Sequence, residues 1–296
     1  MRLEDFEPAR PGVGEVLVRV RAAAANPMDF GIRNGRMKMV TGRSFPRAMG
    51  YDFAGVVEAV GDGVTRLNVG DEVLGGAPFK LGGAFAEVVV AEEKGVVKKP
   101  AGLSFEDAAA IPTVGITALQ ALIVKGKLRR GQAVFVHGCL GGVGRSAVQI
   151  ALAHHATVGG SCRVTARQDA YDLGIDPIVE FDFDPASFTG RFDLVLDTAG
   201  TLPVKAARMM LKPGGRIIGI HPSPWNLARS VLPGPFQTVI ARPVTEDLEE
   251  VARAAGQGTL RLPIARTVPL SAAIPALIEL ERNGMAKSGK LIITPE

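Results

Sequence analysis

The chain has 296 residues, of which 47% are hydrophobic, and 34 basic against 30 acidic side chains give it a net charge of +4. This length allows one large or two ordinary domains, and the basic residues are spread along the chain, which argues against a nucleic-acid-binding surface. No apolar run is long enough to cross a bilayer, the first residues do not resemble a signal peptide, and two cysteines do not form a disulfide framework. We therefore expect a cytoplasmic protein.

The first 97 residues are predicted to be rich in short β-strands. Glycine-containing turns separate apolar runs that alternate with polar residues, a pattern typical of a small barrel or sandwich. The expected strands are 15–21, 56–60, 71–75 and 85–90. A helix is expected after Ser104, because serine is a favourable N-cap and acidic residues follow in the first turn.

From about residue 99 the sequence alternates between strands and helices. Strands are expected at 133–138, 157–161, 177–181, 192–197 and 214–220, and helices at 143–155, 165–173 and 203–211. This alternation predicts a parallel sheet with helices on both faces. Such sheets bind ligands beyond the carboxyl ends of their strands, where Gly138, Ser161, Asp197 and Ile220 lie.

A glycine-rich turn joins the first of these strands to the helix that follows it. Gly141 and Gly144 match the second and third glycines of the dinucleotide-binding fingerprint, while Cys139 stands where the first is usual. The helix N-terminus offers free N–H groups and partial positive charge to an anion. The turn therefore predicts a coenzyme phosphate site, and the alternative is a structural turn in another α/β protein. The residues expected to form the site are Gly138, Gly141, Gly142, Val143 and Gly144.

The last part of the chain is expected to contain helices at 242–255 and 273–282 and strands at 261–268 and 290–293. The two strands fit a return to the first, β-rich domain better than an extension of the parallel sheet. The predicted domains are accordingly 1–98, 99–258 and 259–296, of which the first and last form one domain.

Short segments along nearly the whole chain resemble zinc-free medium-chain dehydrogenases/reductases of the quinone oxidoreductase branch, which includes the zeta-crystallin-like proteins. In chain order the matching segments are Gly14–Val20, Asn26–Asp29, Gly50–Val57, Val69–Val73, Gly115–Ala118, Gly138–Gly144, Asp193–Asp197, Lys212–Arg216 and Gly289–Leu291. The resemblance implies an α/β fold in which a GroES-like β-barrel catalytic domain is combined with a Rossmann domain, a doubly wound parallel sheet. It also implies hydride transfer from NADPH to a quinone or an α,β-unsaturated carbonyl.

The resemblance also indicates chemistry without a metal. Zinc-dependent relatives hold the catalytic metal with two cysteines and a histidine, and the corresponding positions here are Asn26, Tyr51 and Thr113. Zinc prefers thiolate, imidazole and carboxylate ligands, so no catalytic zinc is expected. Direct hydride delivery to an acceptor that is already electrophilic remains feasible.

The end of the second strand of the parallel sheet favours NADPH over NADH. An NAD-preferring site usually carries an acidic residue there, whereas this chain has Ser161, Arg163 and, soon after, Arg167. Ser161 and Arg163 are expected to accept the 2′-phosphate, because arginine presents planar charged donors, and Arg167 is expected to be a further coenzyme contact close by. The alternative is that both arginines are solvated residues at the start of a helix.

Other site residues follow from the resemblance. Tyr51 is expected to orient the acceptor or donate a proton, Asn26 to face the nicotinamide, and Arg47 to affect substrate preference because it replaces a tyrosine common in relatives. Asp52 is expected to be an internal hydrogen-bonding residue. The remaining expected coenzyme contacts are Thr113, Thr117, Thr198, Ile220 and His221.

Two other functions stay open. One is reduction of enoyl thioesters, and the other is a non-catalytic structural or regulatory role with NADPH bound. Relatives usually have an extra strand pair before the segment that begins at Pro11, so a trimmed barrel edge covered by a second copy in a homodimer is also possible. Cys139 and Cys162 are expected to approach each other, as packing residues rather than as a redox switch.

Overall fold

The computed structural model describes residues 1–42, 45–283 and 289–295. The chain divides into two compact units: unit 1 comprises Met1–Thr113 and Pro243–Glu296, and unit 2 comprises Val114–Arg242. Unit 1 is therefore built from both parts of the chain that flank unit 2. The domain limits expected from the sequence stay predictions.

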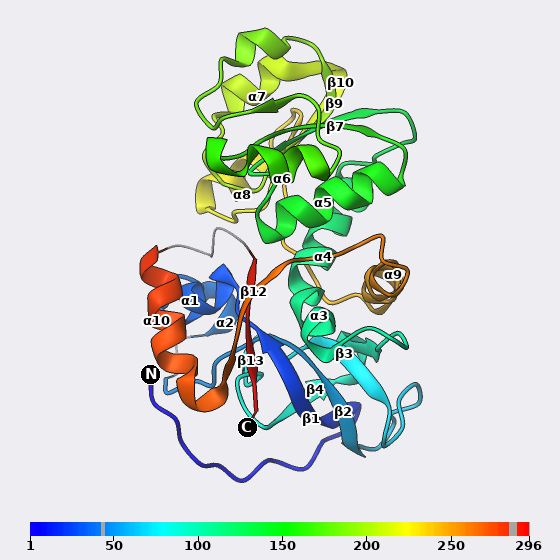
Figure 1. Ribbon diagram of the computed structural model, residues 1–296, viewed down its shortest axis with the longest axis vertical. Coiled ribbons are helices and arrows are strands. Elements are labelled where there is room, and N and C mark those ends of the chain that lie inside the picture. The colour runs from blue at the N-terminus through cyan, green and yellow to red at the C-terminus, as the bar shows by residue number, and fades with distance from the viewer. Residues whose placement is uncertain (43–44, 284–288, 296) are drawn as a thin grey trace. The chain divides into compact units, whose positions relative to one another are not determined.

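Unit 1 contains, within its described residues, a seven-stranded sheet in which β1 is central. The strands are β1 (Glu15–Ala24), β2 (Asp52–Val60), β3 (Glu72–Gly76), β4 (Val88–Glu92), β5 (Val96–Lys98), β12 (Ile264–Pro269) and β13 (Lys290–Thr294). Their order is β12-β13-β1-β2-β3-β5, and β4 also pairs with β1. Figure 1 shows β13, drawn in red, beside the blue β1. The last two strands of the chain therefore lie in the same sheet as β1.

Alternation along β1 shows why the sequence forms this sheet. Val16, Val18 and Val20 are buried, whereas Arg19 and Arg21 are exposed. Successive side chains of a strand point to opposite faces, so one face of β1 packs into the core while the other meets solvent.

Five α-helices accompany this sheet in the described part of unit 1. They are α1 (Pro27–Arg33), α2 (Lys38–Thr41), α3 (Phe105–Ala110), α9 (Thr245–Gly256) and α10 (Ala273–Asn283). The side chain of Ser104 caps α3 by accepting from the Asp107 N–H at 3.0 Å, as predicted. Helices α1 and α10 lie together, since Glu281 accepts hydrogen bonds from Arg33 and Asn34 and Phe30, Leu277 and Leu291 share one hydrophobic cluster.

Unit 2 contains the predicted parallel sheet, with six strands among its described residues. They are β6 (Ala133–His137), β7 (Thr157–Ser161), β8 (Ile178–Val179), β9 (Phe192–Asp197), β10 (Leu211–Gly219) and β11 (Phe236–Thr238), in the order β11-β10-β9-β6-β7-β8. The pairings within this sheet are parallel. Its core contains several aromatic rings, with Phe135 and Phe192 5.2 Å apart between ring centres.

The helices of this region are α4 (Pro112–Leu119), which begins in unit 1, and α5 (Gly142–Ala153), α6 (Arg167–Asp172), α7 (Val204–Met210) and α8 (Pro224–Val231). A π-helical segment, η2 (Gln120–Lys125), follows α4. The helix predicted for 143–155 ends at Ala153, because His155 has a left-handed backbone with φ of 58°. The strand predicted for 177–181 is only the two-residue β8. Helix α8 and strand β11 were not expected from the sequence.

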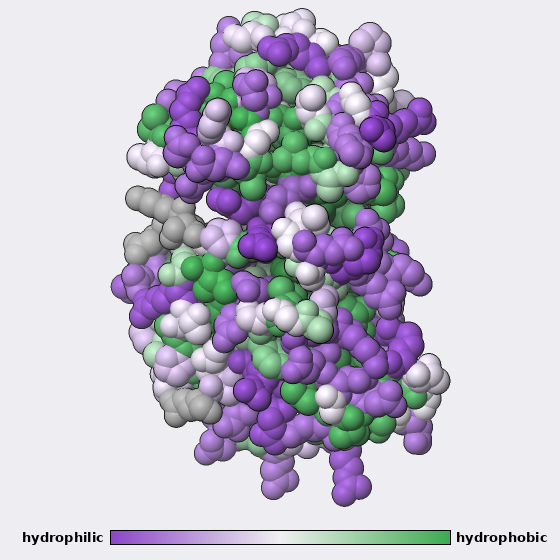
Figure 2. Space-filling model, turned by 45° about the vertical axis from the view of Figure 1, so that its right-hand side comes forward, coloured by the Kyte–Doolittle hydropathy of each residue, from purple (hydrophilic) through white to green (hydrophobic). Residues whose placement is uncertain are grey.

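The face of the molecule drawn in Figure 2 is mainly polar. Figure 2 shows one face on which hydrophilic side chains surround smaller hydrophobic areas. In the portion of the chain that the structure describes, no helix combines the length and hydrophobicity needed to traverse a bilayer.

Candidate functional site

The predicted coenzyme residues of unit 2 gather at one edge of the parallel sheet. Strands β7, β6, β9 and β10 are neighbours in that order, and the carboxyl ends of parallel strands lie at the same edge. The residues at or after these ends are Ser161, Gly138, Thr198, Ile220 and His221. Their positions fit the expectation that this edge receives a ligand.

The turn between β6 and α5 requires glycine for different reasons at different positions. Gly138 has φ of 82°, which favours glycine. A Cβ on Gly144 would overlap the carbonyl oxygen of Gly138, and a Cβ on Gly142 would lie 2.9 Å from Val114 Cγ1. A Cβ on Gly141 would have its nearest neighbour at 3.5 Å. A side chain at Gly141 would thus make only ordinary van der Waals contact, so packing within the chain does not explain this glycine.

The start of α5 can receive an anion. Gly141 is its N-cap and has no side chain to cap the helix, and Val143 lies in the first turn. The first N–H groups of a helix lack partners within the helix, and its dipole is positive at this end. These donors, and a glycine at the N-cap that packing does not require, together fit a coenzyme phosphate.

Hydrogen bonds tie the neighbouring loops together. Thr198 Oγ1 donates to the carbonyl oxygens of His137 and Gly138 at 2.8 and 3.0 Å. The ring of His221 lies with Nε2 3.2 Å from the Thr198 carbonyl oxygen. Thr117 is buried in α4. Thr198 thus acts on the turn through the backbone, in addition to any ligand contact.

Ser161 is fully buried and its hydroxyl is already engaged. It lies 2.7 Å from His137 Nδ1 and accepts from the Gly138 N–H at 3.2 Å. Arg163 and Arg167, in contrast, are exposed, and within the described residues neither guanidinium has a hydrogen bond or ion pair. Of these three expected coenzyme contacts, the two arginines are therefore the accessible ones.

His137 was not identified from the sequence. It is 1% exposed, its Nε2 lies 2.8 Å from Thr201 Oγ1, and burial lowers its pKa while Asp197 raises it. The ring is thus a neutral link between strand ends. The sequence does contain a signal for this residue, because His137 ends an apolar strand directly before the glycine turn.

The two cysteines pack at the same edge. Both are buried, and burial, together with the neighbouring Cys162 thiol, raises the pKa of the Cys139 thiol to about 12. A thiol with so high a pKa holds little of the reactive thiolate at neutral pH. This supports the packing role over the redox role.

In unit 1, strand register brings together residues that are distant in sequence. Ala24 on β1 lies opposite Asp52 on β2 and opposite Ile292 on β13. The Ala25 N–H then donates to the Leu291 carbonyl at 3.0 Å. The residue after Ala25 is Asn26, so Asp52 and Lys290 approach Asn26 from the two strands that flank β1.

These residues form a buried hydrogen-bond network, which we call the Asn26 network: Asn26, Asp29, Asp52, Thr113 and Lys290. Lys290 Nζ donates to Asn26 Oδ1 at 2.6 Å, and Asn26 Nδ2 donates to Asp52 Oδ2 at 2.9 Å. Thr113 Oγ1 donates to Asp52 Oδ1 at 2.6 Å, and the Asn26 N–H donates to Asp29 Oδ2 at 2.7 Å. The network confirms the internal hydrogen-bonding role expected for Asp52. The network also brings Asn26 and Thr113 into contact with Asp52, which directly follows Tyr51 in the chain.

Burial governs the charges in the Asn26 network. Asp52 is 0% and Lys290 3% exposed. Burial raises the pKa of Asp52, although Lys290 and the hydrogen bonds from Thr113 and Asn26 lower it, and burial lowers the pKa of Lys290. Burial also raises the pKa of Asp29 to about 7. Neither Asp29 nor Lys290 was identified as a site residue from the sequence.

Tyr51 and Arg47 lie on the loop before β2. The Tyr51 ring packs edge-on against Phe79 at 5.2 Å and against Gly76, where a side chain would collide with it. Burial, with the charges of Asp52 and Glu92, raises the pKa of Tyr51, so the phenol stays protonated. Arg47 donates to the carbonyl oxygens of Lys80 and Thr41 at 3.0 and 2.7 Å. Arg47 therefore fastens this loop to the one that carries Lys80.

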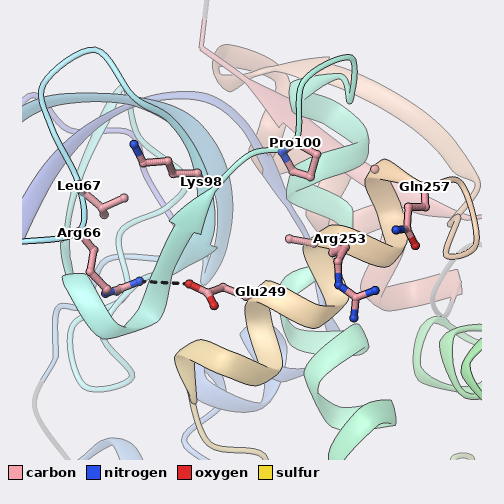
Figure 3. A pocket seen from close by; sticks show the side chains of 9 residues that line it. Arg66, Leu67, Lys98, Pro100, Glu249, Arg253 and Gln257 are labelled. Carbon is pink, nitrogen blue, oxygen red and sulfur yellow. Dashed lines mark ion pairs between the residues drawn. The ribbon is translucent and has the colours of Figure 1, made fainter.

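A separate cavity of about 670 Å³ in unit 1 lies between β5 and α9. Figure 3 shows Arg66 paired with Glu249, together with Arg253 of α9 and Gln257 at its C-cap. The Arg66–Glu249 ion pair has an N–O distance of 3.7 Å. Lys98 and Pro100 line the opposite side. None of the predicted site residues lines this cavity, so it is not the candidate acceptor site.

Comparisons with known proteins agree with the fold and the site described above. A family profile described as alcohol dehydrogenase GroES-like domain matches residues 12–101, and one described as zinc-binding dehydrogenase matches residues 173–293. The chain is 31% identical to the chloroplast envelope quinone oxidoreductase homolog of Arabidopsis thaliana over 301 residues, 96% of this chain and 91% of that protein. The chain belongs to the medium-chain dehydrogenase/reductase family. Its fold is accordingly a GroES-like domain combined with a Rossmann-like parallel sheet.

Two further similarities bear on this medium-chain dehydrogenase/reductase. The structure of the quinone oxidoreductase from Coxiella burnetii aligns with a TM-score of 0.87 and 30% identity, covering 100% of this chain and 95% of that one. The 2-methylene-furan-3-one reductase of Solanum lycopersicum is 36% identical over 217 residues, 69% of this chain and 54% of that protein. Such relatives support an oxidoreductase.

The catalytic zinc of some family members does not fit the residues found here. At the corresponding positions the Asn26 amide is occupied by Lys290 and Asp52, and Tyr51 and Thr113 offer a phenol and an alcohol, which are poor zinc ligands. Across residues 1–42, 45–283 and 289–295, no three His, Cys, Asp or Glu side chains are grouped to hold a metal ion. We therefore assign no reaction step to zinc.

Proposed function

We propose that this chain is an NADPH-dependent, zinc-independent oxidoreductase that transfers hydride to a quinone or an α,β-unsaturated carbonyl. The observation that carries the proposal is the Asn26 network, in which Asn26 and Thr113, at two of the three metal-ligand positions of relatives, are both hydrogen-bonded to Asp52. An acceptor that is already electrophilic can take a hydride without a Lewis acid. The names of the Arabidopsis and tomato relatives support this acceptor class.

The coenzyme, when bound, supplies the hydride. We propose that Gly138, Gly141, Gly142, Val143 and Gly144 hold its phosphates at the start of α5, and that Arg163 and Arg167 recognise the 2′-phosphate. Ser161 then acts indirectly, by fixing the Gly138 N–H and the His137 ring. The remaining proposed coenzyme contacts are Asn26, Thr113, Thr117, Thr198, Ile220 and His221.

On the acceptor side the proposed residues are Tyr51, Asn26 and Arg47. The protonated phenol of Tyr51 can donate a hydrogen bond to an acceptor carbonyl, and within the described residues its hydroxyl has no other partner. The Asn26 side-chain amide is hydrogen-bonded to Lys290 and Asp52 in the Asn26 network. Arg47 shapes the loop that carries Tyr51. Most of the rate is then expected from alignment of the two reactants, rather than from a strong acid or base.

The test is turnover of the full chain with NADPH and with NADH, against small quinones, enones and an enoyl thioester. We expect NADPH oxidation with quinones or enones and a marked preference over NADH. Faster reduction of the enoyl thioester would favour that alternative substrate class. Coenzyme binding without turnover of any acceptor would favour the non-catalytic role and contradict the proposal.

Replacing Arg163 by alanine is expected to weaken NADPH binding roughly tenfold to hundredfold, because charge-assisted hydrogen bonds contribute roughly 1.5–3 kcal/mol. Binding of NADH, which lacks the 2′-phosphate, is expected to stay unchanged. Calorimetric titration with both coenzymes measures this difference. Arg130→Ala, an equal change at another exposed arginine of unit 2, serves as the control, and equal weakening of both coenzymes would rule out the 2′-phosphate contact.

Replacing Tyr51 by phenylalanine is expected to lower turnover only modestly, about two- to tenfold, because one hydrogen bond contributes roughly 0.5–1.5 kcal/mol. The ring contacts with Phe79 and Gly76 remain in this variant. Steady-state kinetics at saturating NADPH measure the effect. A loss of several orders of magnitude would instead identify Tyr51 as the essential proton donor.

For location and assembly we propose a cytoplasmic homodimer. The two unpaired thiols fit a reducing compartment. Analytical sedimentation of the purified chain tests whether it forms a dimer. Besides a second copy of the chain, the proposed partners are the small-molecule acceptor and the coenzyme.

A further inference from the structure

Lys290 is a buried cation to which the proposed function gives no role. It opens β13, and its Nζ donates to Asn26 Oδ1 at 2.6 Å in a site where 3% of the residue is exposed. Its charge lies near the carboxylates of Asp52 and Asp29 without a direct ion pair to either among the described residues. Burying a charge costs free energy, so Lys290 is better explained by the arrangement that it specifies than by stability. The segment Gly289–Leu291 is also part of the resemblance described above.

The contacts of Lys290 show what arrangement is specified. Asn26 is held from both sides, with Oδ1 accepting from Lys290 and Nδ2 donating to Asp52 and to the Ala24 carbonyl. Asp52 in turn receives the N–H and the hydroxyl of Thr113. One chain of hydrogen bonds therefore links the end of β1, the start of β2, the start of α4 and the start of β13.

This chain of bonds passes through or beside each acceptor-side residue. Asn26 is its centre, Thr113 its end, and Tyr51 is bonded through the peptide to Asp52. The positive charge of Lys290 also balances the Asp52 carboxylate, which has no other cation among its interactions. Loss of that charge would leave the buried Asp52 carboxylate without a balancing cation, a costly state that is relieved by proton uptake or by movement of the segment.

We propose that Lys290 is a positioning residue, which holds Asn26, Tyr51 and Thr113 in the arrangement that receives the acceptor. The inference rests on the proposed oxidoreductase function. Asn26 and Thr113 are also proposed coenzyme contacts, but the residues proposed to hold the coenzyme phosphates belong to unit 2 and are not part of the network. The main effect is therefore expected on the acceptor, and only a small one on coenzyme affinity.

The test is Lys290→Met in the full chain, which keeps an unbranched side chain but removes the charge and the donor. We expect kcat/KM for the acceptor to fall about tenfold or more, with a raised acceptor KM, while the NADPH dissociation constant changes less than about threefold. Lys98→Met makes the same change at an exposed lysine paired with Asp71, and it is expected to behave as wild type. If Lys290→Met does not fold, Lys290→Leu, which also removes the charge and the donor, is judged by the same criteria.

A double variant separates positioning from charge balance. Asp52→Asn combined with Lys290→Met removes both charges, so its melting temperature is expected to recover relative to Lys290→Met. Its acceptor kcat/KM is expected to stay low, because Asn26 Oδ1 still lacks its donor. If activity returns together with stability, Lys290 only balances charge and the inference is overturned.

The outcomes also distinguish this inference from the proposed function. A wild-type chain that turns over no acceptor overturns the proposed function, and the inference with it. An active wild type whose Lys290→Met variant has the same kcat and acceptor KM overturns the inference alone.

Discussion

Gly144→Ala is expected to weaken coenzyme binding, raising the NADPH dissociation constant about a hundredfold or more. The reason is that the third glycine of the dinucleotide-binding fingerprint allows close packing of the helix against the strand. The added Cβ would overlap the Gly138 carbonyl oxygen and lie 3.0 Å from the Cys139 backbone. Backbone atoms cannot rotate away, so α5 must shift from the turn. Overpacking of this kind costs roughly 1–3 kcal/mol, which exceeds the gain of roughly 1 kcal/mol when alanine replaces glycine in a helix.

Gly141→Ala, in the same turn, is the matched control. Its Cβ would have 3.5 Å to the nearest protein atom, and Gly141 has φ of −68°. The free energy of unfolding by urea is therefore expected to change by less than about 0.5 kcal/mol. Calorimetry is expected to show weakened NADPH binding even so, because the coenzyme is proposed to fill that space. Normal NADPH binding by Gly144→Ala would show that the turn does not hold the coenzyme.

Asp29→Asn is expected to remove a pH dependence of stability. Burial raises the pKa of Asp29 from 3.8 to about 7 in the folded chain. Between these pH values the native chain binds more protons than the unfolded chain, so the free energy of unfolding falls as pH rises. A shift of about three units corresponds to roughly 4 kcal/mol, so the variant should be more stable than wild type at pH 8 by an amount of roughly 2–4 kcal/mol.

Urea unfolding at pH 5 and pH 8 measures this effect. The asparagine oxygen at position 29 can still accept from the Asn26 N–H, so the α1 cap is kept. Asp62→Asn, on the exposed surface, controls for the change in net charge and is expected to act by less than about 0.5 kcal/mol. An equal pH dependence in wild type and Asp29→Asn would mean that the Asp29 carboxyl is ionised throughout.

The sequence predicted those elements whose signals are local. The alternation of strands and helices from Ala133 to Gly219 was recognised because each apolar run carries its own period. The same type of signal was present but not used for α1, where Asn26, Pro27 and Asp29 form the N-cap, first-turn proline and acidic pattern of a helix start. Ser223 and Pro224 begin α8 in the same way.

The candidate site was less predictable because its contacts are not local. A lysine before an apolar strand is ordinarily read as an exposed strand end, and nothing near Lys290 in the sequence indicates that it meets Asn26 and Asp52. Ser161 is similar: its place after a strand suggested a ligand contact, yet the register of β6 and β7 turns its hydroxyl toward His137. Both arrangements depend on the pairing of strands, which a single sequence specifies weakly.

The pairing of β1 with β13 has a consequence for biosynthesis. Unit 2 is continuous in sequence, whereas the end of β1, at Ala23 and Ala24, pairs with a strand that is translated long after it. Strand β4 pairs with Glu15–Arg19 of β1 much earlier in the chain, so only the end of β1 has to remain unpaired until β13 is made. An unpaired strand edge is a template for aggregation, and contacts that close such long loops also slow folding.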